Sequence, residues 1–308
     1  MTASVRQRHA EAMTGFDPRR ARLALARTGL ALVQLALVVA NPGDLLMPST
    51  PASPAGLDCY GIRAASMWCA GDSAHMPRES LRYIAMAVLL LVASGYRPRW
   101  TAIPHLYVTA SIAASIPVIN GGEHVAQIVV MLLVPVCLGD SRRWQWDRPV
   151  ALLPGRWRGA AYAAHLVLRL QATVLYLTAG LSKLATPEWR EGTALDIIAR
   201  NPRNGFPEPV LQFLEQGTWW QAVATVVSWS TIWIEVAIGV LVWFGPRARR
   251  VVLVIGGLLH CSILFLMGLA SFELTMLLLL VLISSEGVMY RQRGRRREVR
   301  GRATVVCR

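Results

Sequence analysis

Lysine is almost missing from this chain of 308 residues, because 31 of its 32 basic residues are arginine and the single lysine is Lys183. Charged residues of every kind amount to only 16%, whereas a soluble domain usually carries about 25%. Hydrophobic residues make up 54% of the chain and gather in blocks of about 20, the length needed to cross a bilayer. This composition excludes a soluble enzyme, a disordered tail and a secreted disulfide scaffold. It predicts an all-α, multi-pass helical bundle in the cell membrane.

Familiar catalytic and metal-binding motifs are also missing. The chain has no CxxC pair, no HExxH, no P-loop and no GxGxxG between a strand and a helix, so neither a metal site nor a soluble-type hydrolase or nucleotide enzyme is expected. No convincing internal repeat supports a transporter. The net charge of +14 lies between the apolar blocks and in the C-terminal tail. Topology control and contact with membrane lipids explain that placement without nucleic acid.

Eight apolar blocks are expected to form eight membrane spans. Arginine is concentrated in every second connection and at both ends of the chain, so the positive-inside rule places both termini in the cytoplasm. A basic N-terminal segment (1–23) and an Arg-rich tail (289–308) therefore flank one transmembrane domain (24–288). The blocks lie near Ala24–Ala40, Leu81–Gly95, Thr101–Ile119, His124–Gly139, Gly159–Leu184, Trp219–Phe244, Val251–Ala270 and Phe272–Val288.

Two long connections, 41–80 and 185–217, are predicted to lie outside the cell. The first is rich in proline, glycine and serine, and it contains Cys59 and Cys69. Two cysteines ten residues apart on an oxidising face favour a disulfide that closes a small loop. The alternative is a pair of free thiols.

Three ionisable residues are expected near the middle of the membrane. Counting about 1.5 Å per helical residue from the block ends places Arg169, Glu235 and His260 at similar depths. Charged groups at such depth are usually paired or functional. We therefore predict an ion pair between Arg169 and Glu235 with His260 nearby. The alternative is that this pair only fixes the packing of the helices.

A second polar layer is expected near the outer surface. It includes Lys183 and His124, each at the end of a span, with Glu123 and Glu273 at the starts of spans. Helical spacing places five residues on one face of the fifth span, forming a polar stripe towards the outer mouth: Arg169, Thr173, Tyr176, Gly180 and Lys183. A lysine in an apolar recess can be neutral and accept a proton, whereas arginine cannot. The alternatives are a snorkelling lysine and a hydrogen-bonded histidine at a helix end.

Four stretches of the sequence resemble a known family. YLTAGLSKLATPEWREGTAL (Tyr176–Leu195) resembles the signature of the vitamin K-dependent γ-carboxylase-like domain, also called the horizontally transferred transmembrane domain. Asn120–Trp146, Trp233–Gly239 and Leu259–Met276 resemble further stretches of that domain, in the same order. Within the family, the chain is most similar to the branch of the bacterial sporulation-delaying protein SdpB.

The resemblance implies a function and a site. The SdpB branch matures a secreted peptide toxin together with a small partner protein, so a peptide precursor and an SdpA-like protein are implied partners. In the carboxylases, the matching lysine is the base that deprotonates a reduced vitamin K-type quinone. Carried over, this implies Lys183 as base, with His124 and His260 supporting it. The carboxylases also have a large luminal part without counterpart here, which leaves the quinone open. The alternatives are a quinone-dependent carboxylase or epoxidase-like enzyme and a non-enzymatic scaffold, exporter or immunity protein.

Overall fold

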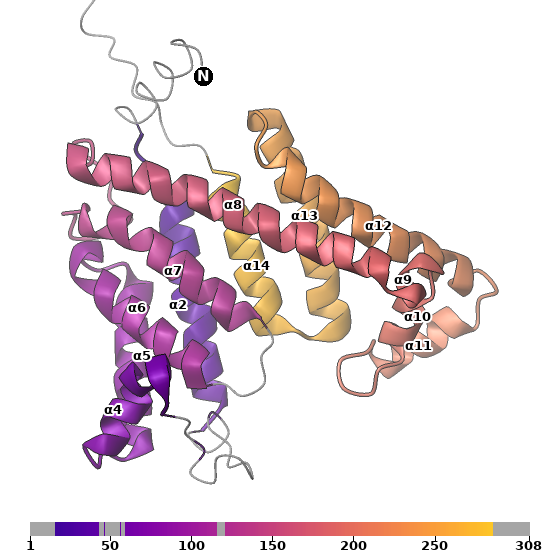
Figure 1. Cartoon of the computed structure of the whole chain (residues 1–308), viewed down its shortest axis with the longest axis horizontal. Helices are drawn as coiled ribbons and strands as arrows, with labels where there is room; N and C mark the ends of the chain where they lie inside the picture. Colours follow the sequence, from indigo (N-terminus) through magenta and orange to yellow (C-terminus); the bar gives the residue numbers. More distant parts are fainter. Residues whose placement is uncertain (1–15, 43–45, 47–55, 57–58, 116–120, 286–308) are drawn as a thin grey trace, which may run out of the picture.

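The computed structural model describes residues 16–42, 46, 56, 59–115 and 121–285. Residues 1–15 of the predicted N-terminal segment (1–23), the Arg-rich tail (289–308), Asn120 and much of the 41–80 connection lie outside these residues. The described chain is helical and contains no β-strand (Figure 1). In order, its helices are α2 (Ala21–Ala40), η1 (Gly61–Ala65), α4 (Met67–Ser73), α5 (Arg78–Ser94), α6 (Pro98–Ser115), α7 (Gly122–Leu138), α8 (Gly155–Ala185), α9 (Pro187–Arg190), α10 (Ala194–Ala199), α11 (Glu208–Glu215), α12 (Trp220–Leu241), α13 (Pro246–Met267) and α14 (Ala270–Ile283).

The predicted helical membrane architecture is confirmed. Each of the eight apolar blocks corresponds to one of the longer helices, from α2 to α14. Four helices, α2, α8, α12 and α13, are long and apolar enough to cross a membrane, and α7 and α14 are shorter apolar helices. The crossing number of eight and the cytoplasmic position of the termini stay predictions.

Proline and glycine set several helix boundaries. Pro246 is the first residue of α13, where the N–H that proline lacks would have no helical partner. Gly95 and Gly268 follow α5 and α13 with φ of 81° and 68°, the left-handed cap that glycine adopts without steric cost. A side chain at Gly95 would also collide with Gln145. This glycine therefore lets the loop before α8 lie against the end of α5.

Two large apolar cores hold most of the bundle together, beside two small clusters of buried apolar residues. One joins α2, α4, α5 and α6 around Trp68 and Leu89. The larger core joins α2, α7, α8 and the last three helices around residues such as Val129, Tyr176 and Leu279. In Figure 1, α8 crosses the whole molecule, from the side of α7 to the group formed by α9, α10 and α11. Its 31 residues span about 46 Å, more than the roughly 30 Å of a bilayer core.

The predicted disulfide between Cys59 and Cys69 is confirmed. It joins Cys59, just before η1, to Cys69 in α4. The neighbouring Trp68 is 1% exposed, and its indole N–H donates to the carbonyl of Ser111 in α6 at 3.1 Å. The disulfide therefore fastens the segment before η1 to a helix that is itself anchored on the bundle.

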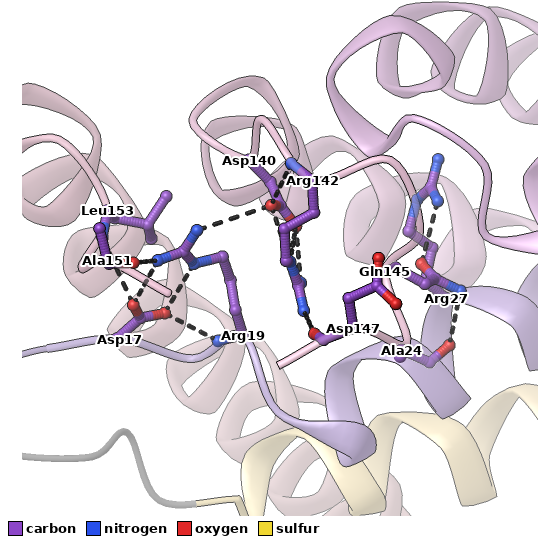
Figure 2. A network of polar contacts seen from close by, with 10 residues as sticks. All are labelled: Asp17, Arg19, Ala24, Arg27, Asp140, Arg142, Gln145, Asp147, Ala151 and Leu153. Atoms are coloured by element: carbon purple, nitrogen blue, oxygen red, sulfur yellow. Dashed lines mark hydrogen bonds and ion pairs between the residues drawn. The ribbon is translucent and has the colours of Figure 1, made fainter. Parts of the chain in front are cut away.

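A polar network closes the opposite end of the bundle, the one predicted to be cytoplasmic (Figure 2). Arg19 pairs with Asp17 at 2.7 Å and lies 3.5 Å from Asp140. Arg142 pairs with the same Asp140 at 2.6 Å. Nearby, the buried Arg27 donates to Gln145 at 3.1 Å, which fastens the loop before α8 to α2. These contacts join the segment before α2 to the loop between α7 and α8.

We expect Asp17→Asn to lower the free energy of unfolding by about 2 kcal/mol at neutral pH, because it breaks a buried ion pair. Burial opposes ionisation of Asp17, but hydrogen bonds and charge from Arg19 outweigh it and hold its pKa below 3.8. A lowered pKa in the folded state means that the pair stabilises the fold at pH values above the unfolded-state pKa. That stabilisation is lost as pH falls through the folded-state pKa.

Thermal unfolding in detergent at several pH values measures this effect. The difference between wild type and Asp17→Asn should be constant above about pH 5 and shrink below about pH 4. Asp147→Asn is a suitable control, because Asp147 is exposed and its backbone carbonyl, rather than its carboxylate, accepts from Arg142. A difference that grows on acidification would contradict the prediction.

Candidate functional site

The single lysine forms an ion pair inside the bundle. Near the end of α8, the Lys183 amine donates to both carboxylate oxygens of Glu235 in α12, at 2.8 and 2.7 Å. It also donates to the carbonyl of Ala179, one turn earlier, at 3.3 Å. The two charged side chains are only 20% and 12% exposed. The amine therefore turns back along α8, whereas a snorkelling lysine would extend towards the headgroups.

A close approach of two helices brings the pair together. A Cβ atom at Gly180 would lie 3.2 Å from the carbonyl oxygen of Ile232 and 3.3 Å from the Cβ of Glu235. Two turns before Gly180 on α8, the Thr173 hydroxyl donates to the carbonyl of Gly239 at 3.0 Å. Small residues at such a crossing let membrane helices pack tightly. This packing places Glu235 within reach of the lysine.

The predicted ion pair between Arg169 and Glu235 is wrong, because Glu235 pairs with Lys183. Arg169 instead donates to the carbonyls of Ile283 and Ser285 at the end of α14, at 3.3 and 3.4 Å. Arg169 and Lys183 are 14 positions apart on α8, or about 21 Å. Counting from the start of α8 placed Arg169 at the depth of Glu235. That count fails because α8, with 31 residues, extends past the end of α12, which has 22.

A second polar cluster lies deeper on the same face of α8. The Tyr176 hydroxyl lies 2.6 Å from Nε2 of His260 in α13. The other ring nitrogen of His260 contacts the carboxylate of Glu273 in α14. All three side chains are buried, with 1%, 4% and 1% exposure. With a hydrogen on Nδ1 the histidine donates to Glu273 and accepts from Tyr176, so one neutral imidazole satisfies both partners.

The stripe predicted on α8 meets the C-terminal helices. Every one of its five residues has a contact there: Arg169 and Tyr176 reach α14 and α13, whereas Thr173, Gly180 and Lys183 reach α12. The two polar clusters follow one another on this face, because Tyr176 and Lys183 lie seven residues, or two turns, apart on α8. The face of α8 was therefore predictable, although the pairing was not.

His124 is not placed beside Lys183. The α7 helix runs antiparallel to α8, and Gly139 at its end lies against Trp157 at the start of α8. Counting back 15 residues along α7 and forward 26 along α8 leaves the two side chains roughly 15 Å apart in depth. His124 is exposed, whereas Glu123 beside it is buried and accepts from the Ser271 hydroxyl at 3.2 Å. Glu123 thus joins α7 to the start of α14.

Sequence reasoning missed one residue at the lysine. The Lys183 amine lies 5.1 Å from the centre of the Trp189 ring, at cation–π distance. A signal was present in its spacing, because a residue six positions after a helix-terminal lysine can fold back over it through a short turn such as α9. Trp189 covers the amine on the side predicted to face outwards.

Comparison with known proteins places the chain in a family. A model of the HTTM domain matches residues 152–286, which hold α8 and every helix after it. The uncharacterized protein YitO of Bacillus subtilis (strain 168) is 31% identical over 261 residues, which cover 84% of this chain and 83% of YitO. The chain belongs to the HTTM-domain family. Both polar clusters described above lie within the matched residues.

A second relative carries a role in its name. The sporulation-delaying protein SdpB of Bacillus subtilis (strain 168) is 29% identical over 268 residues, which cover 87% of this chain and 82% of SdpB. No solved structure matches the chain. The resemblance noted from the sequence is confirmed at the level of the family and of similarity to SdpB.

The arrangement can move a proton. Transfer from the Lys183 amine to Glu235 would turn the ion pair into a neutral amine and a neutral acid, and the amine could then accept a proton from a bound group. The apolar cavity of about 570 Å³ on α12 and α13 is lined by residues such as Trp229, Trp233 and Ile255 and by neither Lys183 nor Glu235, so it does not bring a quinone against this pair. We therefore derive no step through a quinone.

Proposed function

We propose that this protein acts in the maturation of a secreted peptide of the sporulation-delaying type, as a multi-pass protein of the cell membrane. Similarity to SdpB along most of both chains supports this role. The precursor peptide and a small SdpA-like protein are its proposed partners. We further propose that Lys183 is the catalytic base of the modification, in a recess that opens outwards.

One observation carries the catalytic proposal: the only lysine of the chain is held against Glu235 by two short hydrogen bonds, with a tryptophan over it. An ion pair that served packing alone could be built with arginine, which this chain uses at every other basic position. Arginine keeps its proton near neutral pH, whereas lysine can release it to a neighbouring carboxylate. The choice of lysine at this one place therefore favours proton transfer. His260 is proposed to support the same site through Tyr176, which lies two turns from Lys183 on the same face of α8.

Lys183→Arg tests the proposal. The variant keeps the positive charge beside Glu235 and removes the base, so we expect normal abundance in the membrane and loss of the mature peptide to background. The protein is expressed with the precursor and the partner, and the secreted peptide is analysed by mass spectrometry. Arg200→Lys is the reciprocal control. Arg200 follows α10, its side chain is 45% exposed, and it pairs with Asp196. This substitution should leave the product unchanged.

An unchanged amount of mature peptide from Lys183→Arg would overturn the proposal that Lys183 is the catalytic base. The protein would then be a scaffold, an exporter or an immunity protein. His124→Ala separates the histidines: because His124 is exposed and distant in depth from Lys183, we expect it to leave the product unchanged. Loss of product in that variant, at normal abundance, would restore the shared site predicted from the sequence.

A further inference from the structure

A cavity of about 380 Å³ lies beside the polar network at the end of the bundle predicted to be cytoplasmic. Its lining has two parts. Asp17, Arg19, Arg20 and Arg148 supply the charged part, and the stretch 149–152 supplies an apolar part. None of these residues belongs to the two polar clusters, Lys183–Glu235 and Tyr176–His260–Glu273.

The charged part carries an excess of positive charge. Asp17 is fully engaged by Arg19, through a side-chain pair at 2.7 Å and a backbone hydrogen bond at 3.1 Å. Arg20 and Arg148 are both exposed, and neither has a carboxylate partner among the residues described from 16 to 285. Three arginines against one aspartate leave a net charge of +2 at the cavity.

The position of Arg20 adds to this potential. It is the residue before the first turn of α2, a helix of 20 residues that has no acidic side chain in that turn. The first N–H groups of a helix and its dipole favour an anion at that end. The cavity, the unpaired arginines and the helix end thus coincide.

The rest of the wall is rigid and partly apolar. Arg19 donates to the carbonyl of Ala151 at 2.5 Å, and the N–H of Leu153 donates to Asp17 at 3.4 Å (Figure 2). These bonds hold the 149–152 stretch in place along one side, where Val150 is fully exposed. A cavity with a cationic side and an exposed apolar rim suits a phosphate group on an amphiphile.

We propose that this cavity binds a phosphate group, carried by an anionic lipid of the adjoining leaflet or free in solution. A guanidinium group can donate two parallel hydrogen bonds to the oxygens of one phosphate. Basic pockets beside membrane helices bind lipid headgroups. Arg20 and Arg148 are the groups that contact the phosphate, whereas Asp17 and Arg19 shape the wall. The proposal does not depend on the role of Lys183.

The double variant Arg20→Gln/Arg148→Gln tests the site against Arg247→Gln/Arg250→Gln. The control removes two exposed arginines from the first turns of α13, at the end predicted to be cytoplasmic and outside the cavity. Full-length protein in a neutral detergent is titrated with inorganic phosphate at low salt. In parallel, protein from nanodiscs of phosphatidylglycerol and phosphatidylcholine is examined by native mass spectrometry for retained lipid. Thermal unfolding checks that both variants fold.

We expect the cavity variant to weaken phosphate binding by about tenfold or to lose retained phosphatidylglycerol, while the control matches wild type. Loss in the lipid arm alone identifies a lipid headgroup, and loss in the phosphate arm alone identifies a free phosphate. Equal losses in both variants would show attraction by overall charge and overturn the site, as would no loss in either arm.

Discussion

Glu235→Gln is expected to lower the free energy of unfolding by about 3 kcal/mol. The substitution keeps the size of the side chain and removes its charge, which leaves the Lys183 ammonium with one neutral oxygen and the Ala179 carbonyl. Both side chains are largely buried, so water cannot replace the lost carboxylate. Breaking one partner of such a pair costs more than the pair contributes, because it leaves a charge desolvated and uncompensated.

A double-mutant cycle separates pairing from burial. Lys183→Met and Glu235→Leu should each destabilise the fold, whereas the combined variant should recover most of the loss, because no charge stays unpaired. The measurement is unfolding in detergent micelles by heat or by sodium dodecyl sulfate. Additive losses in the combined variant would show that the two side chains are independent.

The same substitution at an exposed ion pair provides the control. Glu215 pairs with Arg200 outside the predicted spans, and the two side chains are 37% and 45% exposed. Ion pairs of this kind contribute about 0–1 kcal/mol, so Glu215→Gln should have little effect. If Glu235→Gln were equally mild, the Lys183–Glu235 pair would be solvated, and the burial on which this prediction rests would be wrong.

The sequence predicted the elements of the site better than its pairs. The spacing of seven between Arg169, Tyr176 and Lys183 defined one face of α8, and those side chains do meet the C-terminal helices. Helical periodicity depends only on neighbours in sequence, so it can be read from one chain. The disulfide was predictable for a similar reason, because ten residues and an oxidising face leave Cys59 and Cys69 few other partners.

Pairing between helices depends on relative height, which the sequence does not fix. Arg169 was matched with Glu235 by counting from block ends, yet α8 is about 46 Å long and overlaps its neighbours only in part. The direction of the lysine side chain was equally hidden, since its turn back towards Ala179 depends on Glu235 across the crossing at Gly180. His124 was misplaced beside Lys183 because α7, with 17 residues, is far shorter than α8.

His260→Leu is expected to have a still larger effect, a loss of about 4 kcal/mol in the free energy of unfolding. The substitution removes the donor to Glu273 and the acceptor of the Tyr176 hydroxyl together. Oε1 of Glu273 already has no hydrogen-bond partner in the described chain, so the variant would leave this buried carboxyl without any. Two orphaned polar groups at 1% exposure each carry a desolvation cost.

His165→Leu is the matched control for this prediction. His165 lies on α8 and is 8% exposed, but its Nε2 has no hydrogen-bond partner among the described residues, and the ring contacts Phe16. Leucine at this position removes an unsatisfied polar atom and strands no partner. We therefore expect a change of less than about 1 kcal/mol, although the same chemical change is made at a similarly buried site.

Removing the whole polar cluster should then reverse most of the damage. In Tyr176→Phe/His260→Leu/Glu273→Leu no buried polar group is left unpaired, and apolar side chains occupy a site between three packed helices. A fully apolar replacement of a buried network is often neutral, whereas a partial one is not. The triple variant should thus unfold closer to wild type than His260→Leu does. If it is less stable than the single variant, the three side chains do not form one hydrogen-bonded unit.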